Sequence, residues 1–195
     1  MRAARETAGP GLPGADGPGS GAPHAGRAGF DDFARRERSA LVAFAWSLTG
    51  SLATAEEIAQ EALVAAWRSW DAVGDYDRPG AWARRVVANR ASSHWRSAGR
   101  EGRALARLAG RAGRDGGAGG DTVELPETDA ALWAAVRELP DRQAHVIALY
   151  YLEDRSVAET AAILECAEGT VKAHLYKARL ALARTLGLLA EEDDR

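Results

Sequence analysis

The distribution of glycine and proline divides this chain of 195 residues into segments that can fold and segments that cannot. Residues 1–29 contain eight glycines and four prolines, and residues 99–128 contain eight more glycines. Segments of this composition bury too little apolar surface to offset the conformational entropy that folding removes. We therefore expect a disordered tail at 1–29 and a flexible linker at 99–128. The run Glu191-Glu192-Asp193-Asp194 makes 188–195 an acidic tail. Two pieces, 30–98 and 129–187, are left to fold, and each is small enough to be only marginally stable.

Apolar residues in both pieces recur with the period of an α-helix, and no useful stretch alternates like a β-strand. In the first piece, an apolar stripe ends at Gly50, and the spacing of Thr54 and Glu57 predicts a capping box that begins a second helix. A third helix is predicted to begin at Pro79 and to fade after Ser97. The predicted fold is all-α, with two small helical domains joined by the linker.

The second piece contains the strongest local signal. Thr128 is predicted to cap its first helix, and Ser156 with Glu159 predicts a capping box for a helix of only two turns. A break at residues 165–167 separates that helix from a longer one whose Val171 and Leu175 should be buried. A short helix, a tight break and a longer helix with basic outward positions are typical of a helix-turn-helix, although a plain helical hairpin with solvated lysines is the alternative.

Charge is distributed unevenly along the chain, although the formal net charge is only −3. Residues 78–100 contain six arginines and no acid, and residues 169–190 contain four basic residues and no acid. Two separate basic stretches indicate local contacts with anions, while ordinary solvated helix faces would give the same pattern. In the second stretch, the positions away from the predicted core are the candidate contacts to duplex DNA: Thr170, Lys172, Ala173, His174, Tyr176 and Lys177.

The predicted third helix mixes arginines with Trp82, Trp95 and Asn89. Arginine follows a phosphate backbone, aromatic rings stack on unpaired bases, and an amide reads a base edge. The mixture therefore favours single-stranded or melting DNA over an intact duplex. Both tryptophans could instead belong to the core.

The second helix carries acidic and amide side chains opposite its apolar stripe, namely Glu57, Gln60 and Glu61. They form either an ordinary charged surface or a docking face for a basic partner. Catalysis is not expected, because the histidines are scattered and no nucleophile stands beside a base. The single cysteine, Cys166, excludes an internal disulfide and argues against a zinc site. No apolar stretch is long enough to cross a membrane or follows the early arginines as a secretory signal would. These features fit a protein of the reducing cytoplasm.

Several of these motifs together resemble a known family. Six segments resemble the corresponding motifs of bacterial RNA polymerase sigma factors of the extracytoplasmic-function type. In the first piece they are Thr54-Ala55-Glu56-Glu57-Ile58-Ala59-Gln60-Glu61 and Trp82 … Val86-Val87-Ala88-Asn89. In the second piece they are Leu139-Pro140-Asp141-Arg142-Gln143, Tyr150-Tyr151-Leu152-Glu153-Asp154, Ser156-Val157-Ala158-Glu159 and Gly169-Thr170-Val171-Lys172. The resemblance covers about 30–98 and 129–187 and leaves out the N-terminal tail and most of the linker.

The resemblance implies a function in promoter recognition, without catalysis, cofactor or membrane insertion. Residues 30–98 would bind core RNA polymerase through Glu57, Gln60 and Glu61. They would also bind the −10 element through five further residues: Asp75, Tyr76, Arg84, Asn89 and Arg90. Residues 129–187 would read the −35 element through the helix-turn-helix. A membrane-bound or soluble anti-sigma factor commonly holds members of this class inactive.

The chain departs from the family pattern at the helix-turn-helix break, where Leu-Gly-Cys-Ser is usual and Leu164-Glu165-Cys166-Ala167 stands here. The lost glycine is expected to strain a turn that favours positive φ, and the lost serine removes a helix cap, each at a cost of about 1 kcal/mol. The alternative function is a helix-turn-helix regulator of the response-regulator effector type, which residues 169–175 also resemble. That class requires an α/β receiver domain, and no strand pattern precedes residue 129.

Overall fold

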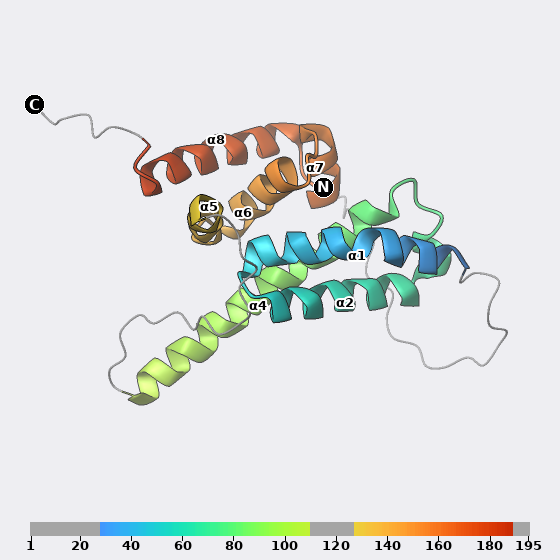
Figure 1. Cartoon of the computed structure of the whole chain (residues 1–195), viewed down its shortest axis with the longest axis horizontal. Helices are drawn as coiled ribbons and strands as arrows, with labels where there is room; N and C mark the ends of the chain where they lie inside the picture. The colour runs from blue at the N-terminus through green and yellow to red at the C-terminus, as the bar shows by residue number, and fades with distance from the viewer. Residues whose placement is uncertain (1–27, 110–126, 189–195) are drawn as a thin grey trace, which may run out of the picture.

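The computed structural model describes residues 28–109 and 127–188, with side chains at 29–96 and 130–188. Within these ranges the chain forms helices and no strand, which confirms the predicted all-α class. The elements are α1 (Ala28–Thr49), α2 (Leu52–Arg68), α3 (Trp70–Val73), α4 (Pro79–Ala109), α5 (Glu127–Arg137), α6 (Asp141–Ile147), the π-helical turn η1 (Ala148–Leu152), α7 (Val157–Leu164) and α8 (Glu168–Thr185) (Figure 1). We call α1–α4 the N-terminal helices and α5–α8, with η1, the C-terminal helices.

The N-terminal helices begin with an antiparallel pair. Gly50 has a φ of 73° and ends α1, since only glycine adopts this conformation without strain. Ser51 then caps α2, because its hydroxyl oxygen accepts a hydrogen bond from the backbone N–H of Thr54 at 3.3 Å. The predicted capping box at Thr54 and Glu57 is therefore wrong: the serine three residues earlier supplies the acceptor, and α2 begins at Leu52.

Two predicted helix boundaries also differ. Pro79 begins α4 as expected, but the helix continues past Ser97 to Ala109 and takes in part of the predicted linker. Gly99 and Gly102 weaken a helix by about 1 kcal/mol each relative to alanine without forbidding it. Helix α5 begins at Glu127, one residue before the predicted cap at Thr128. Most of the predicted linker, and nearly all of both predicted tails, lie outside the described residues.

The C-terminal helices form the predicted helix-turn-helix from α7 and α8. The capping box at Ser156 and Glu159 is confirmed: the Glu159 N–H donates to the Ser156 hydroxyl at 3.1 Å, and the Ser156 N–H donates to the Glu159 carboxylate at 3.0 Å. At the break, Glu165 adopts the left-handed conformation with a φ of 51°, so the strain expected from the missing glycine is present. Ala167 stands at the N-cap of α8 with only a methyl group, which cannot accept a hydrogen bond.

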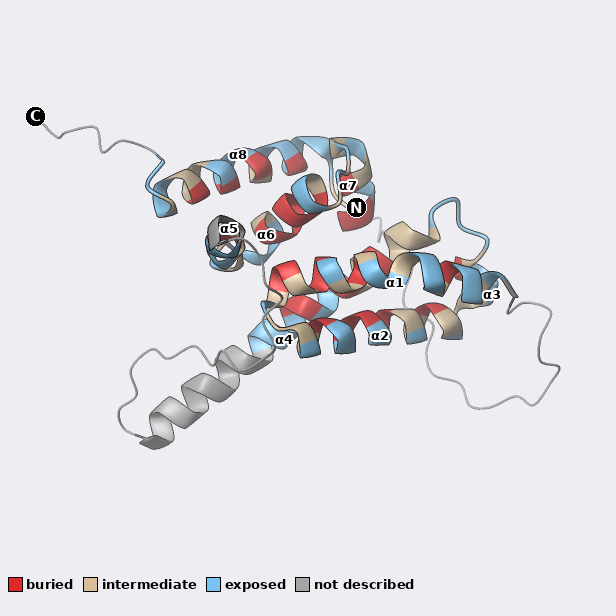
Figure 2. Cartoon of the chain, in the orientation of Figure 1, coloured by how far each residue is buried: buried red, intermediate tan, exposed pale blue. Residues whose placement is uncertain are grey.

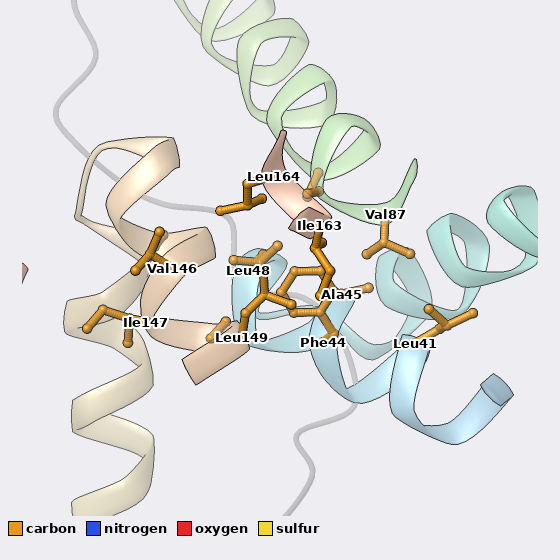
Figure 3. Close-up of a cluster of buried hydrophobic side chains, with 14 of the residues drawn as sticks. Leu41, Phe44, Ala45, Leu48, Val87, Val146, Ile147, Leu149, Ile163 and Leu164 are labelled. Carbon is orange, nitrogen blue, oxygen red and sulfur yellow. The ribbon is translucent and has the colours of Figure 1, made fainter. Parts of the chain in front are cut away.

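One hydrophobic core joins the N-terminal and C-terminal helices, where the sequence predicts two separate pieces. Helix α1 contacts α5 and η1, and α7 packs against α4. Leu149 and Ile163 lie beside Phe44 and Leu48 in Figure 3, and all four side chains are buried. The buried faces of α1 and of the C-terminal helices are turned toward each other in Figure 2. The described residues therefore pack as one closed body.

Candidate nucleic-acid interfaces

Helix α8 presents the side chains predicted to contact duplex DNA. Val171, Leu175, Ala178 and Leu182 are buried on its inner face. The outer face carries Thr170, Lys172, Ala173, Tyr176 and Lys177, all of them exposed, with Tyr176 70% exposed. His174 is half-buried, and within the described chain its Nδ1 has no hydrogen-bond partner. The helical period thus brings five of the six predicted residues to one open surface and leaves His174 at its edge.

Basic and aromatic groups extend this surface toward η1. The Arg179 guanidinium donates a hydrogen bond from Nε to the Tyr151 hydroxyl at 2.7 Å and lies 5.7 Å from the ring centroid of Tyr150. Lys172 Nζ lies 4.0 Å from the Glu168 carboxylate, an exposed pair of little energetic weight. The lysines therefore remain free to contact phosphates.

A second candidate surface lies on α4 and the loop before it. Asp75 and Tyr76 in the loop, and Asn89 and Arg90 on the helix, are exposed. Trp82 is half-buried and packs against the core, which favours the structural interpretation of that ring. Trp95 is 45% exposed, and its indole N–H donates to the Leu48 carbonyl at 2.9 Å. Four of the five residues predicted for the −10 element are therefore accessible.

Arg84 is the exception, because it is buried beneath the C-terminal helices. Its Nη1 donates to the Glu37 carboxylate at 2.6 Å and to the Gly80 carbonyl at 3.0 Å, while its Nε pairs with Glu153. Burial lowers the pKa of Arg84, but hydrogen bonds and charge from Glu153 and Glu37 more than offset this effect and raise the pKa above its usual value. In this arrangement the guanidinium cannot contact a phosphate, so the predicted backbone contact is not available.

Two neighbouring arginines also pair with carboxylates, but in more exposed positions than Arg84. Arg85 on α4 pairs with Glu165 at the end of α7, and Arg78 in the preceding loop lies 3.6 Å from the Glu159 carboxylate. We call Arg78, Arg84 and Arg85 the arginine face. Each of its members is paired with a carboxylate of the C-terminal helices.

The predicted polymerase-docking residues Glu57, Gln60 and Glu61 are all exposed on α2. Gln60 borders a groove of about 540 Å³ between α1 and α2. The Glu61 carboxylate lies 3.3 Å from Arg90 Nε on α4. The predicted docking face and the predicted −10 surface therefore adjoin.

Sequence reasoning missed the two acidic residues that pair with Arg84. Glu37 is part of a mixed-charge stretch in the first helix, and nothing in the sequence distinguishes it from its neighbours. Glu153 is 69 residues from Arg84, and its side chain is only 6% exposed. A motif contained Glu153, but no local pattern indicates its partner. Among the described residues, no group of histidine, cysteine, aspartate and glutamate is arranged to hold a metal ion.

Comparison with known proteins identifies the family. Residues 33–101 match the family described as sigma-70 region 2, and residues 129–182 match sigma-70, region 4. The chain is 34% identical over 166 residues to the ECF RNA polymerase sigma factor SigL of Mycobacterium tuberculosis, covering 82% of this chain and 88% of that protein. The chain belongs to the extracytoplasmic-function sigma factors. It is also 30% identical to the RNA polymerase sigma-E factor of Streptomyces avermitilis over 80% of this chain and 84% of that protein.

Solved structures agree with this assignment. The sigma factor RpoE of Bartonella quintana, in complex with the anti-sigma factor NepR, has a TM-score of 0.64 and is 26% identical over 83% of this chain and 98% of that chain. CnrH, in complex with the cytosolic domain of CnrY, shares the fold with a TM-score of 0.55 at 24% identity, covering 83% of this chain and 89% of that chain. The match to region 2 disfavours the response-regulator alternative. None of the described helices of this sigma factor is both long and apolar enough to cross a membrane.

Proposed function

We propose that this sigma factor binds core RNA polymerase and positions it at promoters through two separate DNA-reading surfaces. The N-terminal helices, within 30–98, bind polymerase and the −10 element, and the C-terminal helices, within 129–187, bind the −35 element. The observation that carries this proposal is the open basic face of α8, the second helix of a helix-turn-helix whose first helix, α7, begins with a capping box. A helix presented in this way fits the major groove of duplex DNA.

The −35 element is read from the outer face of α8. Lys177 contacts the phosphate backbone, Lys172 lies nearer the base edges, and Ala173 and Tyr176 lie between them. A methyl group and an aromatic ring can contact base edges and thymine methyl groups. Thr170 lies in the first turn, where free backbone N–H groups attract a phosphate. His174 is half-buried, so it contacts DNA only at the edge of this surface.

The −10 element is read by the exposed residues of α4 and its preceding loop. Asn89 supplies an amide for an unpaired base, and Asp75 and Tyr76 border the same region. Arg90 contacts the backbone of the melted strand. Arg84 joins this surface only where the C-terminal helices have moved away from it.

Core polymerase docks on Glu57, Gln60 and Glu61 of α2. Their exposure supports a surface for a basic partner. An anti-sigma factor is a further partner, since the sigma factor RpoE, which has this fold, has been solved in complex with the anti-sigma factor NepR. The protein acts as a non-enzymatic initiation factor without a cofactor, in the cytoplasm where polymerase works.

Binding of core polymerase by charge-reversed variants tests the docking face. Glu61→Lys places a positive charge where a basic partner binds, so its affinity should fall at least tenfold while its helical content is retained. Asp71→Lys is the matched control, because Asp71 is an exposed acid of the N-terminal helices outside the proposed face. The assay contains no DNA, since Glu61 also pairs with Arg90. Equal affinity of the two variants would refute the assignment of this face.

A further inference from the structure

Two adjacent tyrosines of η1 hold an arginine of α8 in a defined position. The rings of Tyr150 and Tyr151 lie edge to face, with their centroids 5.0 Å apart. The guanidinium carbon of Arg179 lies 5.7 Å from the ring centroid of Tyr150 and 5.6 Å from that of Tyr151. Its Nε also donates the hydrogen bond of 2.7 Å to the Tyr151 hydroxyl. We call these three residues the tyrosine–arginine cluster.

The cluster keeps hydrogen-bond donors that the described chain does not use. Arg179 and Tyr151 are both exposed. Within the described residues Arg179 makes no ion pair, in contrast to the arginine face. The bond to Tyr151 uses only the Nε–H of the guanidinium, and the Tyr151 oxygen is the acceptor in that bond, so its own O–H proton remains available. The exposed edge of the cluster therefore offers a phenol O–H, guanidinium N–H groups and an unpaired positive charge side by side.

This set of donors matches a phosphate group. Phosphate oxygens accept paired hydrogen bonds from the planar guanidinium and single hydrogen bonds from tyrosine hydroxyls. The negative charge of the phosphate also compensates the charge of Arg179. Because the cluster lies on the same helix as the lysines assigned to DNA, a phosphate of duplex DNA is the anion that its position favours.

The register of α8 places Arg179 at the border of the major groove. Arg179 follows Lys172 by seven residues, which is about 10.5 Å along the helix axis and within about 20° of the same direction around it. The major groove is about 12 Å wide. With Lys172 close to the base edges, Arg179 therefore reaches the edge of the groove, where the phosphates lie.

Arg179 and Lys177 point to opposite sides of the helix. They are two residues apart, which separates their directions by about 160° around the axis. A helix that lies in the major groove has one DNA strand on each side. The two cations are therefore placed to contact different strands.

The aromatic contacts also reduce the cost of binding. A flexible basic side chain loses rotamer freedom when it binds a phosphate. The rings of Tyr150 and Tyr151 already restrict the guanidinium of Arg179 in the free protein. A phosphate bound here consequently orders little that is not ordered before it arrives.

We propose that Tyr151 and Arg179 together bind one backbone phosphate of the −35 duplex, on the strand opposite to that contacted by Lys177. Tyr150 supports the guanidinium without contacting DNA. This inference rests on the proposed function and adds η1 to the −35 surface. Contacts to both strands fix the angle at which α8 enters the groove.

The salt dependence of DNA binding tests the charge of this contact. Fluorescence anisotropy measures binding of the full-length protein to a labelled random-sequence duplex at several NaCl concentrations. Arg179→Gln should weaken binding and reduce the slope of log K against log [NaCl] by about 1, since one phosphate fewer is neutralised. Arg184→Gln removes the same charge at the far end of α8 and should leave the slope unchanged. Equal slopes for wild type and Arg179→Gln would overturn the proposal.

Tyr151→Phe separates a DNA contact from a purely structural role. The substitution keeps the ring beside Arg179 and removes the hydroxyl, so affinity should fall several-fold while the salt slope stays the same. The variant with both Tyr151→Phe and Arg179→Gln should lose less affinity than the product of the two single losses, because both residues bind one phosphate. A lower Tm of Tyr151→Phe with unchanged DNA affinity would assign the hydroxyl to the fold alone and contradict the proposal.

Duplexes with single neutral phosphates identify the strand. Each phosphate of a −35 duplex, taken from a promoter that the protein directs, is replaced in turn by a methylphosphonate. Replacement of the phosphate that Arg179 contacts should weaken binding of the wild type and leave binding of Arg179→Gln unaffected. For Lys177→Ala, the replacement without effect should lie on the other strand. Insensitive positions on the same strand for both variants would contradict the assignment of strands.

The lysine variant also separates the two levels of the argument. If neither Lys177→Ala nor Arg179→Gln reduces the salt slope, the outer face of α8 does not bind DNA, and the proposed function fails together with this inference. If Lys177→Ala reduces the slope and Arg179→Gln does not, the proposed function stands and the phosphate contact of the cluster is refuted.

Discussion

Ser92 on α4 and His145 on α6 share a hydrogen bond of 3.3 Å across the contact between the N-terminal and C-terminal helices. Both residues are buried, and His145 is only 5% exposed. Burial lowers the pKa of His145 to about 4, opposed weakly by the charge of Asp141 and assisted by that of Arg142. The neutral imidazole is therefore part of the closed structure.

This pairing predicts a pH dependence of stability. Because the folded pKa lies below the ordinary value of 6.5, the unfolded chain binds the proton more tightly. The contribution of His145 to stability is complete above pH 6.5 and declines as the pH falls toward 4. A shift of this size corresponds to a loss on the order of 3 kcal/mol.

The measurement is urea denaturation of wild type and His145→Gln between pH 4 and pH 8. The glutamine variant is less stable throughout but should lose less free energy of unfolding between pH 6.5 and pH 4 than the wild type. The acidic residues are common to both proteins, so their contribution to the pH dependence of stability cancels in the comparison. Parallel curves for the two proteins would show that His145 is not buried in its neutral form.

The helix-turn-helix break predicts a stabilising substitution. Ala167 occupies the N-cap of α8 but offers no acceptor to the first backbone N–H groups. Ala167→Ser supplies a hydroxyl and should raise the free energy of unfolding by about 1 kcal/mol. Ser156→Ala removes the working cap of α7 and should lower it by a similar amount. Thermal denaturation of both variants checks the pair, and a loss of stability in Ala167→Ser would contradict the assigned cap.

Promoter melting should depend on Asn89. Its side chain is exposed on α4, close to Arg90 and free to meet an unpaired base. Asn89→Ala should slow formation of the open complex by about tenfold, a difference of roughly 1.4 kcal/mol in the barrier, while initial binding to duplex promoter changes little. Permanganate footprinting over time measures the melted −10 region. Normal melting by the variant would show that the amide has another role.

Reading of the −35 element should distinguish two lysines of α8. Lys172 lies nearer the N-terminal end of the helix, which enters the groove, so Lys172→Ala should cost about 1–3 kcal/mol on a matched duplex alone. Lys177 contacts the backbone, so Lys177→Ala should weaken matched and scrambled duplexes alike and reduce the salt slope by about 1. Arg184→Ala, at the far end of the same helix, is the control. Equal losses for both lysine variants on both duplexes would remove the distinction.

Local signals account for what could be predicted from the sequence. The capping box at Ser156 and Glu159 and the turn around Glu165 depend on residues a few positions apart, so their spacing is visible in the sequence. The exposure of Lys172 and Tyr176 follows from the helical period once Val171 is placed in the core. The sequence does not identify the cap of α2, because Ser51 and Thr54 carry similar signals and only the geometry shows which hydroxyl accepts the hydrogen bond.

The contact between the two sets of helices could not be predicted in this way. In the sequence, Arg84 does not differ from the other basic residues of an arginine-rich helix, and its partner Glu153 lies 69 residues further along the chain. A glycine-rich segment between them indicates separate domains, but it does not exclude packing of one domain on the other. Such packing depends on complementary surfaces, here Leu149 and Ile163 against α1, which have no local sequence pattern.

Transcription in a reconstituted system tests promoter direction itself. Genomic fragments from the source organism are transcribed by core polymerase with and without this protein, and the 5′ ends of the RNA are mapped. We expect a discrete set of start sites that appear only with the protein and share sequence elements near −10 and −35. A pattern of start sites that is the same with and without the protein would contradict its assignment as a promoter-directing sigma factor.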